Sequence, residues 1–188
     1  MGWGVRYTHR FMVVFFGDLA TTSAGYAAAC LVNMVIHYLA LAGISKEVSG
    51  AAHRPTALFL GLFLLFSLMA THGSLPSSWY LLTGILSLGA ATGFTLLYIW
   101  SLCLIWTRQI IGTRHKIFAA VTCVAAIGCY EHAAAITVIA SITAYMAATF
   151  YNHQHRLFFR LLVGIAVIFT FISFFCRGNF RRKTKRAV

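Results

Sequence analysis

The most constraining feature of the sequence is an apolar stretch from Ile117 to Tyr151, interrupted near its middle by Gly128-Cys129-Tyr130-Glu131-His132. As one α-helix, about 35 residues would extend roughly 50 Å, well beyond the roughly 30 Å hydrocarbon core of a bilayer. We therefore expect the chain to fold back at the interruption. Glu131 is one of only three acidic residues, with Asp18 and Glu47. An ionisable group near membrane depth is a candidate functional residue, although a wet turn between two helices would look the same.

The composition indicates an integral membrane protein. Hydrophobic residues make up 60% of the chain and charged residues 10%, against roughly 25% charged in soluble domains. The apolar runs are unbroken rather than alternating, which favours helices over an outer-membrane barrel. The formal charge of +12 does not indicate nucleic-acid binding, because the basic residues lie between apolar runs and in a terminal tail. There they suit topology signals and contacts with membrane lipid.

Five scattered cysteines without a CxxC pair predict buried small residues rather than a disulfide or zinc framework, and we expect no metal site and no cofactor. They are Cys30, Cys103, Cys123, Cys129 and Cys176.

The chain is expected to form a single all-α membrane domain over residues 1–188, a polytopic helix bundle of about six segments. Residues 1–19 would be an interfacial or re-entrant segment, 24–175 the transmembrane bundle and 176–188 a basic tail. The expected spans are 24–43, 56–70 or 71, 79–106, 117–127, 133–151 and 161–175.

Charge predicts which loops share a side of the membrane. A basic set falls in loops on one face, which the positive-inside rule makes cytoplasmic, whereas 72–78 and 130–132 carry no Lys or Arg. The set comprises Lys46, Arg54, Arg108, Arg114, Lys116, Arg156 and Arg160. With six spans the arginines from position 177 onward end on the opposite face, against the rule. Either the last segment does not fully cross, or those arginines bind something anionic.

Three polar clusters would then meet on the outer face. They are His72 with Trp79, Tyr80 and the residues to Gly84; Tyr130-Glu131-His132; and Arg177-Gly178-Asn179 with Arg181 and Arg182. Arginine forks bind phosphate, aromatic rings stack on sugars and a carboxylate accepts hydroxyl protons, so the clusters suit a sugar attached to a phosphate. The alternative is interfacial anchoring by Trp and Arg, which is common in membrane proteins.

Short motifs in these clusters resemble a known family. Trp79-Tyr80-Leu81-Leu82-Thr83-Gly84 is similar to the aromatic-Trp-Leu-Thr-Gly stretch of uncharacterised bacterial multi-span proteins related to O-antigen glucosyltransferases and to C-type (GT-C) glycosyltransferases. Glu131 resembles the family's single Glu, and the segment 175–181 resembles its Pro-Gly-Asn motif with a trailing Arg. Upstream, Trp3-Gly4-Val5-Arg6-Tyr7 with Arg10-Phe11 is similar to its Trp-x-Gly-Arg-Tyr segment.

The resemblance implies a shortened GT-C-like core in a bacterial inner (cytoplasmic) membrane, which transfers a sugar from a polyprenyl-phosphate donor to a cell-surface glycan. It implies Glu131 as the catalytic residue. The implied substrate-binding residues are Trp79, Tyr80, His72, His132, Arg177, Asn179 and Arg181. The chain departs from the family in two ways. The usual outer-loop catalytic acid has no counterpart before the Gly-Arg-Tyr-like segment, and Arg177 replaces the Pro.

Other classes of protein remain open. A small non-enzymatic membrane subunit or scaffold, working with other membrane subunits, fits the short length and the Ala/Gly-rich helix faces at 24–29 and 133–148. A transporter component is less favoured, because only one helix break is evident. A haem-binding bundle would need two histidines at similar depth, and only His37 lies inside an expected span.

Overall fold

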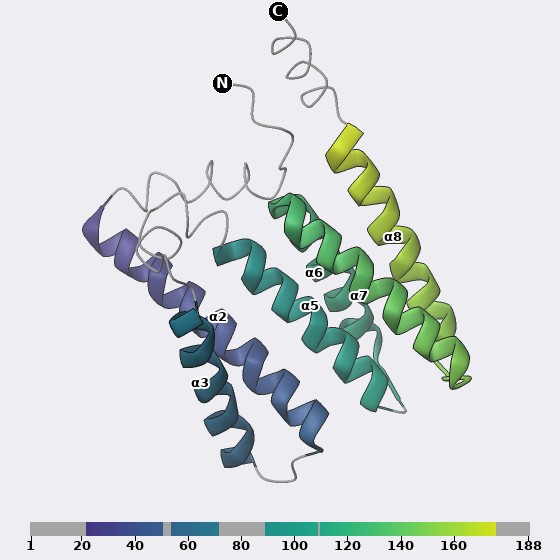
Figure 1. Ribbon diagram of the computed structural model, residues 1–188, viewed down its shortest axis with the longest axis horizontal. Coiled ribbons are helices and arrows are strands. Elements are labelled where there is room, and N and C mark those ends of the chain that lie inside the picture. The colour runs from purple at the N-terminus through teal and green to yellow at the C-terminus, as the bar shows by residue number, and fades with distance from the viewer. Residues whose placement is uncertain (1–21, 51–53, 72–88, 109, 176–188) are drawn as a thin grey trace, which may run out of the picture.

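The computed structural model describes residues 22–50, 54–71, 89–108 and 110–175, which form six helices (Figure 1). The helices are α2 (Ser23–Ser49), α3 (Arg54–Thr71), α5 (Ala90–Thr107), α6 (Thr113–Cys129), α7 (Glu131–Phe150) and α8 (Arg156–Phe175). Four of them, α2, α5, α7 and most of α8, are long and apolar enough to cross a membrane. The expected all-helical membrane bundle is confirmed for the described part of the chain. The interfacial segment 1–19 and the tail 176–188 lie outside it.

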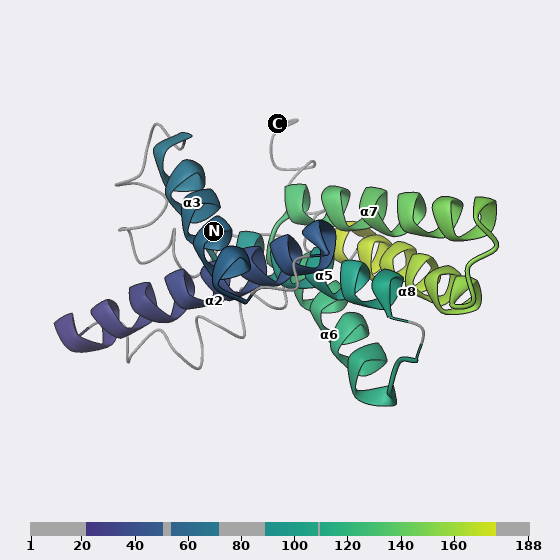
Figure 2. The same cartoon turned by 90° about the horizontal axis from the view of Figure 1, so that it is seen from below.

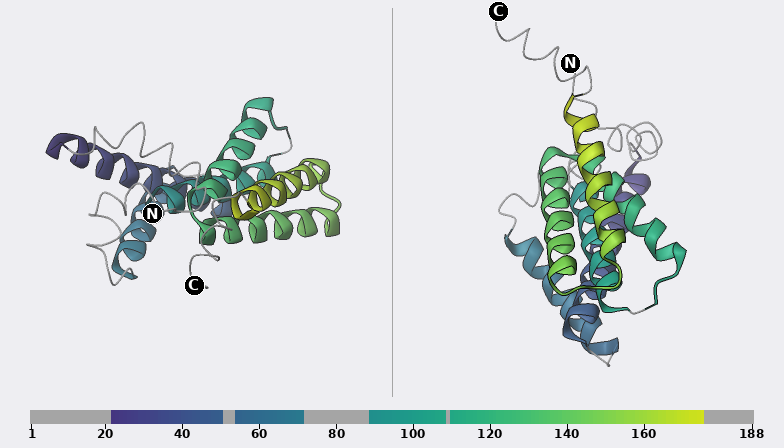
Figure 3. Two further views of the ribbon diagram at one scale, coloured as in Figure 1. Left: turned by 90° about the horizontal axis from the view of Figure 1, so that it is seen from above. Right: turned by 90° about the vertical axis from the view of Figure 1, so that its right-hand side faces the viewer.

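Consecutive helices run in opposite directions, and α5 lies at the centre (Figure 1). It packs against α2 on one side and against α6 and α7 on the other, while α3 packs on α2 and α8 packs on α6 and α7. Figures 2 and 3 show α7 and α8 side by side, with α6 diverging from them toward its N-terminal end. The bundle is therefore broad and shallow, and most helices keep one face toward the surroundings.

The fold-back predicted at 128–132 is confirmed. Helix α6 ends at Cys129 and α7 begins at Glu131. Between them, Tyr130 is extended, with φ −156° and ψ 149°. A single non-helical residue therefore reverses the chain, and α6 and α7 pack against each other.

Three expected boundaries were wrong. Helix α6 begins at Thr113, so Arg114 and Lys116 lie in its first turn rather than in a basic loop. Helix α2 continues past Gly43 to Ser49, so Lys46 and Glu47 lie in its last turns rather than in a loop; it ends at Gly50, whose φ of 58° suits glycine. Helix α8 begins at Arg156, so the polar loop expected over 152–160 is shorter. The three errors have one cause, because charged side chains at a helix end can extend toward water without breaking the helix.

The core is small and the lipid-facing surface large. Tyr98, Ile105, Cys123, Phe159 and Leu162 are at most 1% exposed and lie in one cluster formed by α5, α6, α7 and α8. Large apolar side chains stand outward on α3 and α8, such as Phe59, 74% exposed, and Phe171, 60% exposed. Hydrocarbon solvates these side chains as well as a protein interior does, so their exposure is typical of a membrane bundle.

Several hydroxyl groups inside the bundle are satisfied by carbonyls of their own helix. The hydroxyls of Ser45, Thr95 and Thr122 donate to backbone carbonyls one turn earlier, as apolar surroundings demand. Within α7, the Ser141 hydroxyl donates to the Thr137 carbonyl at 2.7 Å. The Tyr98 hydroxyl of α5 is therefore the donor in the 2.6 Å bond that it makes to Ser141 Oγ across the two helices. This bond joins α5 to α7 in the middle of the core.

Close helix contacts depend on glycine. A Cβ at Gly61 of α3 would lie 2.7 Å from Cα and Cβ of Ala42 on α2, and the Trp100 ring of α5 covers Gly43. On α5, Gly89 faces Asn33 and Gly93 faces His37, both buried side chains of α2. Small residues therefore set the spacing of α2 to both of its neighbours, as in other membrane helix pairs.

Candidate functional site

Glu131 begins α7, at the end of the bundle where α5 also begins. The N-terminus of a helix carries partial positive charge, which favours a carboxylate there. The side chain is partly buried and His132 is exposed, while the rings of Tyr130 and His132 meet edge to face at 5.3 Å. Ala90 and Ala91 at the start of α5 pack with Cys129, Ala133 and Tyr130 around this turn.

Only part of the expected sugar-phosphate site falls within the described residues. Glu131 and His132 do, whereas His72, Trp79, Tyr80, Arg177, Asn179 and Arg181 lie outside them. The meeting of the three clusters therefore stays a prediction. Among the described residues, α5 begins beside Tyr130, and α8 runs toward the same end of the bundle (Figure 1).

The opposite end of the bundle gathers the basic residues. The Thr107 hydroxyl donates to Glu47 Oε2 at 2.5 Å and the Arg108 guanidinium lies 3.8 Å from Glu47 Oε1, which joins the last turn of α2 to the end of α5. Lys116 of α6 lies over the Phe158 ring of α8, and Arg156 donates to Asn152 Oδ1. These contacts agree with the single basic face predicted from sequence; its assignment to the cytoplasm stays a prediction.

An aromatic cluster closes the gap between α5 and the α7–α8 turn. The rings of Trp106 and His153 stack at 4.7 Å with an interplanar angle of 11°, and Phe159 lies about 6 Å from both. His153 Nδ1 accepts the backbone N–H of His155 at 3.2 Å, so the proton sits on Nε2, which donates to the Trp106 carbonyl at 3.1 Å. Both ring nitrogens are thus engaged, which fixes the imidazole in one orientation.

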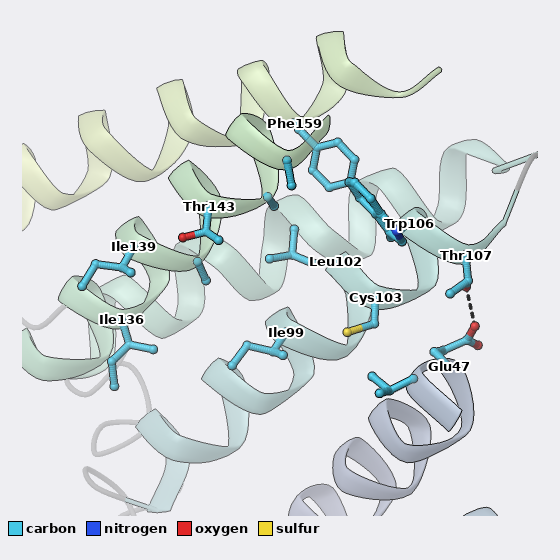
Figure 4. Close-up of a pocket in the computed structure, with 14 residues that line it drawn as sticks. Glu47, Ile99, Leu102, Cys103, Trp106, Thr107, Ile136, Ile139, Thr143 and Phe159 are labelled. Carbon is cyan, nitrogen blue, oxygen red and sulfur yellow. Dashed lines mark hydrogen bonds between the residues drawn. The ribbon is translucent and has the colours of Figure 1, made fainter. Parts of the chain in front are cut away.

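A lateral groove of about 660 Å³ runs between α5 and α7, from the Glu47–Thr107 pair to one turn short of the Glu131 turn (Figure 4). Its floor and walls are apolar, and its polar groups are few. The lining residues are Glu47, Val48, Ile99, Leu102, Cys103, Trp106, Thr107, Ile136, Ile139, Ala140, Thr143, Ala144, Ala147 and Phe159. From Ile136 to Ala147 the groove follows α7 for roughly 16 Å, about half of a hydrocarbon core.

A second cleft, of about 400 Å³, lies on the other face of α5, against α6. Arg108 and His115 lie at its polar end, and Trp100 and Phe118, whose rings meet edge to face at 6.2 Å, form a wall. Helical periodicity explains the separation, because Leu102 and Trp106 share one face of α5 while Trp100, Leu104 and Arg108 share another.

Within the described ranges, no three His, Cys, Asp or Glu side chains gather as potential metal ligands. Cys30, Cys103, Cys123 and Cys129 form no disulfide within the described part of the chain. His37 lies inside α2, fully buried, with Nδ1 2.7 Å from the Asn33 carbonyl oxygen. That histidine contributes to α2–α5 packing.

Sequence reasoning missed the groove and the pairing of Glu47 with Thr107. One signal was present, since Glu47 is the single acid near the basic loops and an isolated carboxylate there suggests a partner. No sequence signal marks the groove, because most of its lining residues are ordinary apolar residues of α5 and α7.

The fold and the groove define a class, a small all-helical membrane protein with a lateral apolar groove. Comparisons with protein families, with curated proteins and with solved structures give no match to this chain.

Proposed function

We propose that this membrane protein binds a long-chain amphiphile, with the apolar chain in the groove between α5 and α7. The observation that supports the proposal is the groove's polarity, apolar for roughly 16 Å along α7 and ending at a carboxylate and a hydroxyl. A volume of about 660 Å³ is in the range of specific small-molecule sites. An acyl or isoprenoid chain would fill the apolar length, and a hydroxyl or amine of its headgroup would meet Glu47.

The test is photolabelling of the purified full chain with a photoreactive isoprenyl or acyl alcohol. We expect labelled peptides from α5 and α7, and loss of labelling in Thr143→Phe, whose new ring fills the groove. Thr143 is exposed, so the change leaves the core intact. Thr149→Phe is the matched control, because Thr149 is exposed on the same helix but lies outside the groove. Equal labelling of the two variants would exclude the groove as the site.

Sugar transfer from a polyprenyl-phosphate donor to a cell-surface glycan, at a bacterial inner membrane, is the second candidate. It is favoured by the packing of Ala90 and Ala91 against Tyr130, because the segment 72–88 directly precedes the start of α5 in the sequence. In this proposal Glu131 acts as the general base toward the acceptor hydroxyl, and the groove holds the polyprenyl chain.

The transferase proposal is tested by supplying membranes with a labelled polyprenyl-phosphate sugar and measuring label in the glycan. Glu131→Gln should lower transfer by about 10²-fold or more if the carboxylate is the base. The circular dichroism spectrum and the unfolding stability of Glu131→Gln should match those of the wild type. If the wild type takes up the lipid probe but transfers no sugar, the non-enzymatic subunit is the better description.

A further inference from the structure

We propose that the cleft between α5 and α6 binds the phosphate group of an anionic membrane lipid, at a site separate from the α5–α7 groove. The cleft has a volume of about 400 Å³ and is lined by Trp100, Ser101, Leu104, Arg108, His115 and Phe118. Its residues combine a cation and an imidazole with an apolar wall. That combination matches a headgroup with chains attached.

The charge at this end of the bundle favours an anion. Among the described residues there, Glu47 is the one carboxylate, and it already accepts the Thr107 hydroxyl. The basic residues at the same end of the bundle are Lys46, Arg108, Arg114, Lys116, Arg156 and Arg160. Such an excess of positive charge attracts anionic headgroups at the membrane surface.

Two side chains in the cleft supply the donors that a phosphate needs. Arg108 has its side chain 46% exposed and meets Glu47 only at 3.8 Å, so most of its five N–H donors remain for a second anion. His115 Nδ1 is buried and has no hydrogen-bond partner among the described residues. The Ser101 hydroxyl donates to the Tyr98 carbonyl at 2.6 Å and contributes no donor.

The apolar half of the lining selects a lipid over a soluble phosphate. Leu104, Phe118 and the ring carbons of Trp100, whose Nε1 faces Gly43 of α2, offer a phosphate ion no hydrogen bond, but they offer acyl chains an apolar surface. Basic clefts between membrane helices bind anionic headgroups in this way. The site differs from the groove in both position and charge.

The experiment measures lipid bound to the purified full chain by native mass spectrometry, with phosphatidylglycerol and phosphatidylcholine added at equal concentration. The wild type should prefer phosphatidylglycerol. Arg108→Gln and His115→Phe should each reduce that preference, the former by about tenfold, as expected for loss of a charge-assisted hydrogen bond. Arg160→Gln removes the same charge at the same end, from an exposed position outside the cleft, and should keep the preference.

Three results would overturn the inference. The wild type could bind both lipids equally, Arg108→Gln and Arg160→Gln could have equal effects, or millimolar inorganic phosphate could displace the bound lipid. The last result would assign the cleft to soluble phosphate. Thr143→Phe should leave the preference unchanged, so failure of the groove proposal and failure of this one are distinguishable.

Discussion

The contact between Gly61 and Ala42 makes the sharpest prediction. Replacing glycine by alanine should lower stability at position 61 but raise it at position 164. In Gly61→Ala the new Cβ would lie 2.7 Å from Cα and Cβ of Ala42 and 2.8 Å from its backbone nitrogen. Backbone atoms cannot rotate away, so α3 and α2 must separate by about 0.7 Å to reach ordinary contact. A gap of that size forfeits a quarter to a half of the dispersion energy of the atoms that it parts.

We expect Gly61→Ala to lower the free energy of unfolding by about 1–3 kcal/mol, the usual cost of overpacking. Gly164→Ala in α8 is the control, because its Cβ meets nothing within 4 Å. There only the gain in helix propensity acts, a stabilisation of about 0.5–1 kcal/mol. The assay is equilibrium unfolding of the two variants and the wild type in mixed detergent micelles. If Gly61→Ala proves as stable as Gly164→Ala, the close contact of α2 and α3 does not exist.

Three further predictions concern the core, the aromatic cluster and the topology. Tyr98→Phe removes the buried bond to Ser141 and should cost about 1 kcal/mol in the same unfolding assay; a neutral effect would contradict the α5–α7 hydrogen bond. His153→Phe keeps a ring on the indole but loses two hydrogen bonds, so indole fluorescence should become broader and red-shifted, and an unchanged spectrum would refute the fixed stack. In a cysteine-free background, a cysteine at position 132 should react with an impermeant maleimide in intact cells, and one at position 152 only after permeabilisation. Identical labelling of the two would contradict their placement at opposite ends of the bundle.

Sequence alone could predict the helical class, the number of described segments and the fold-back at Glu131, because these depend on local length and polarity. It could also predict that the basic residues lie at one end of the bundle, because their positions between apolar runs can be read directly from the sequence. It failed at the beginning of α8, where Arg156 and Arg160 look like loop residues but occupy the first turns of a helix. The expected third span is described only from Ala90, so its beginning at Trp79 stays a prediction.

The groove could not be predicted because it depends on how the helices are rotated. Leu102 and Ile139 are typical membrane residues, and nothing in their sequence context separates a groove wall from a surface that faces lipid. The bond between Thr107 and Glu47 joins residues 60 positions apart, so it follows only once α2 and α5 are placed. Gly61 illustrates the same limit, since its importance depends on the backbone opposite.

The one-residue turn at Tyr130 has a consequence for how the protein enters the membrane during synthesis. Helix α6 has 17 residues and is not among the helices long enough to span by themselves, whereas α7 has 20 and is. With only Tyr130 between them, α6 cannot remain at the membrane surface while α7 inserts. We therefore expect the translocon to insert both helices together as one hairpin. The more apolar α7 would then draw the shorter and less apolar α6 into the bilayer. Lengthening this turn would let α6 be skipped, and every helix after it would insert with inverted orientation.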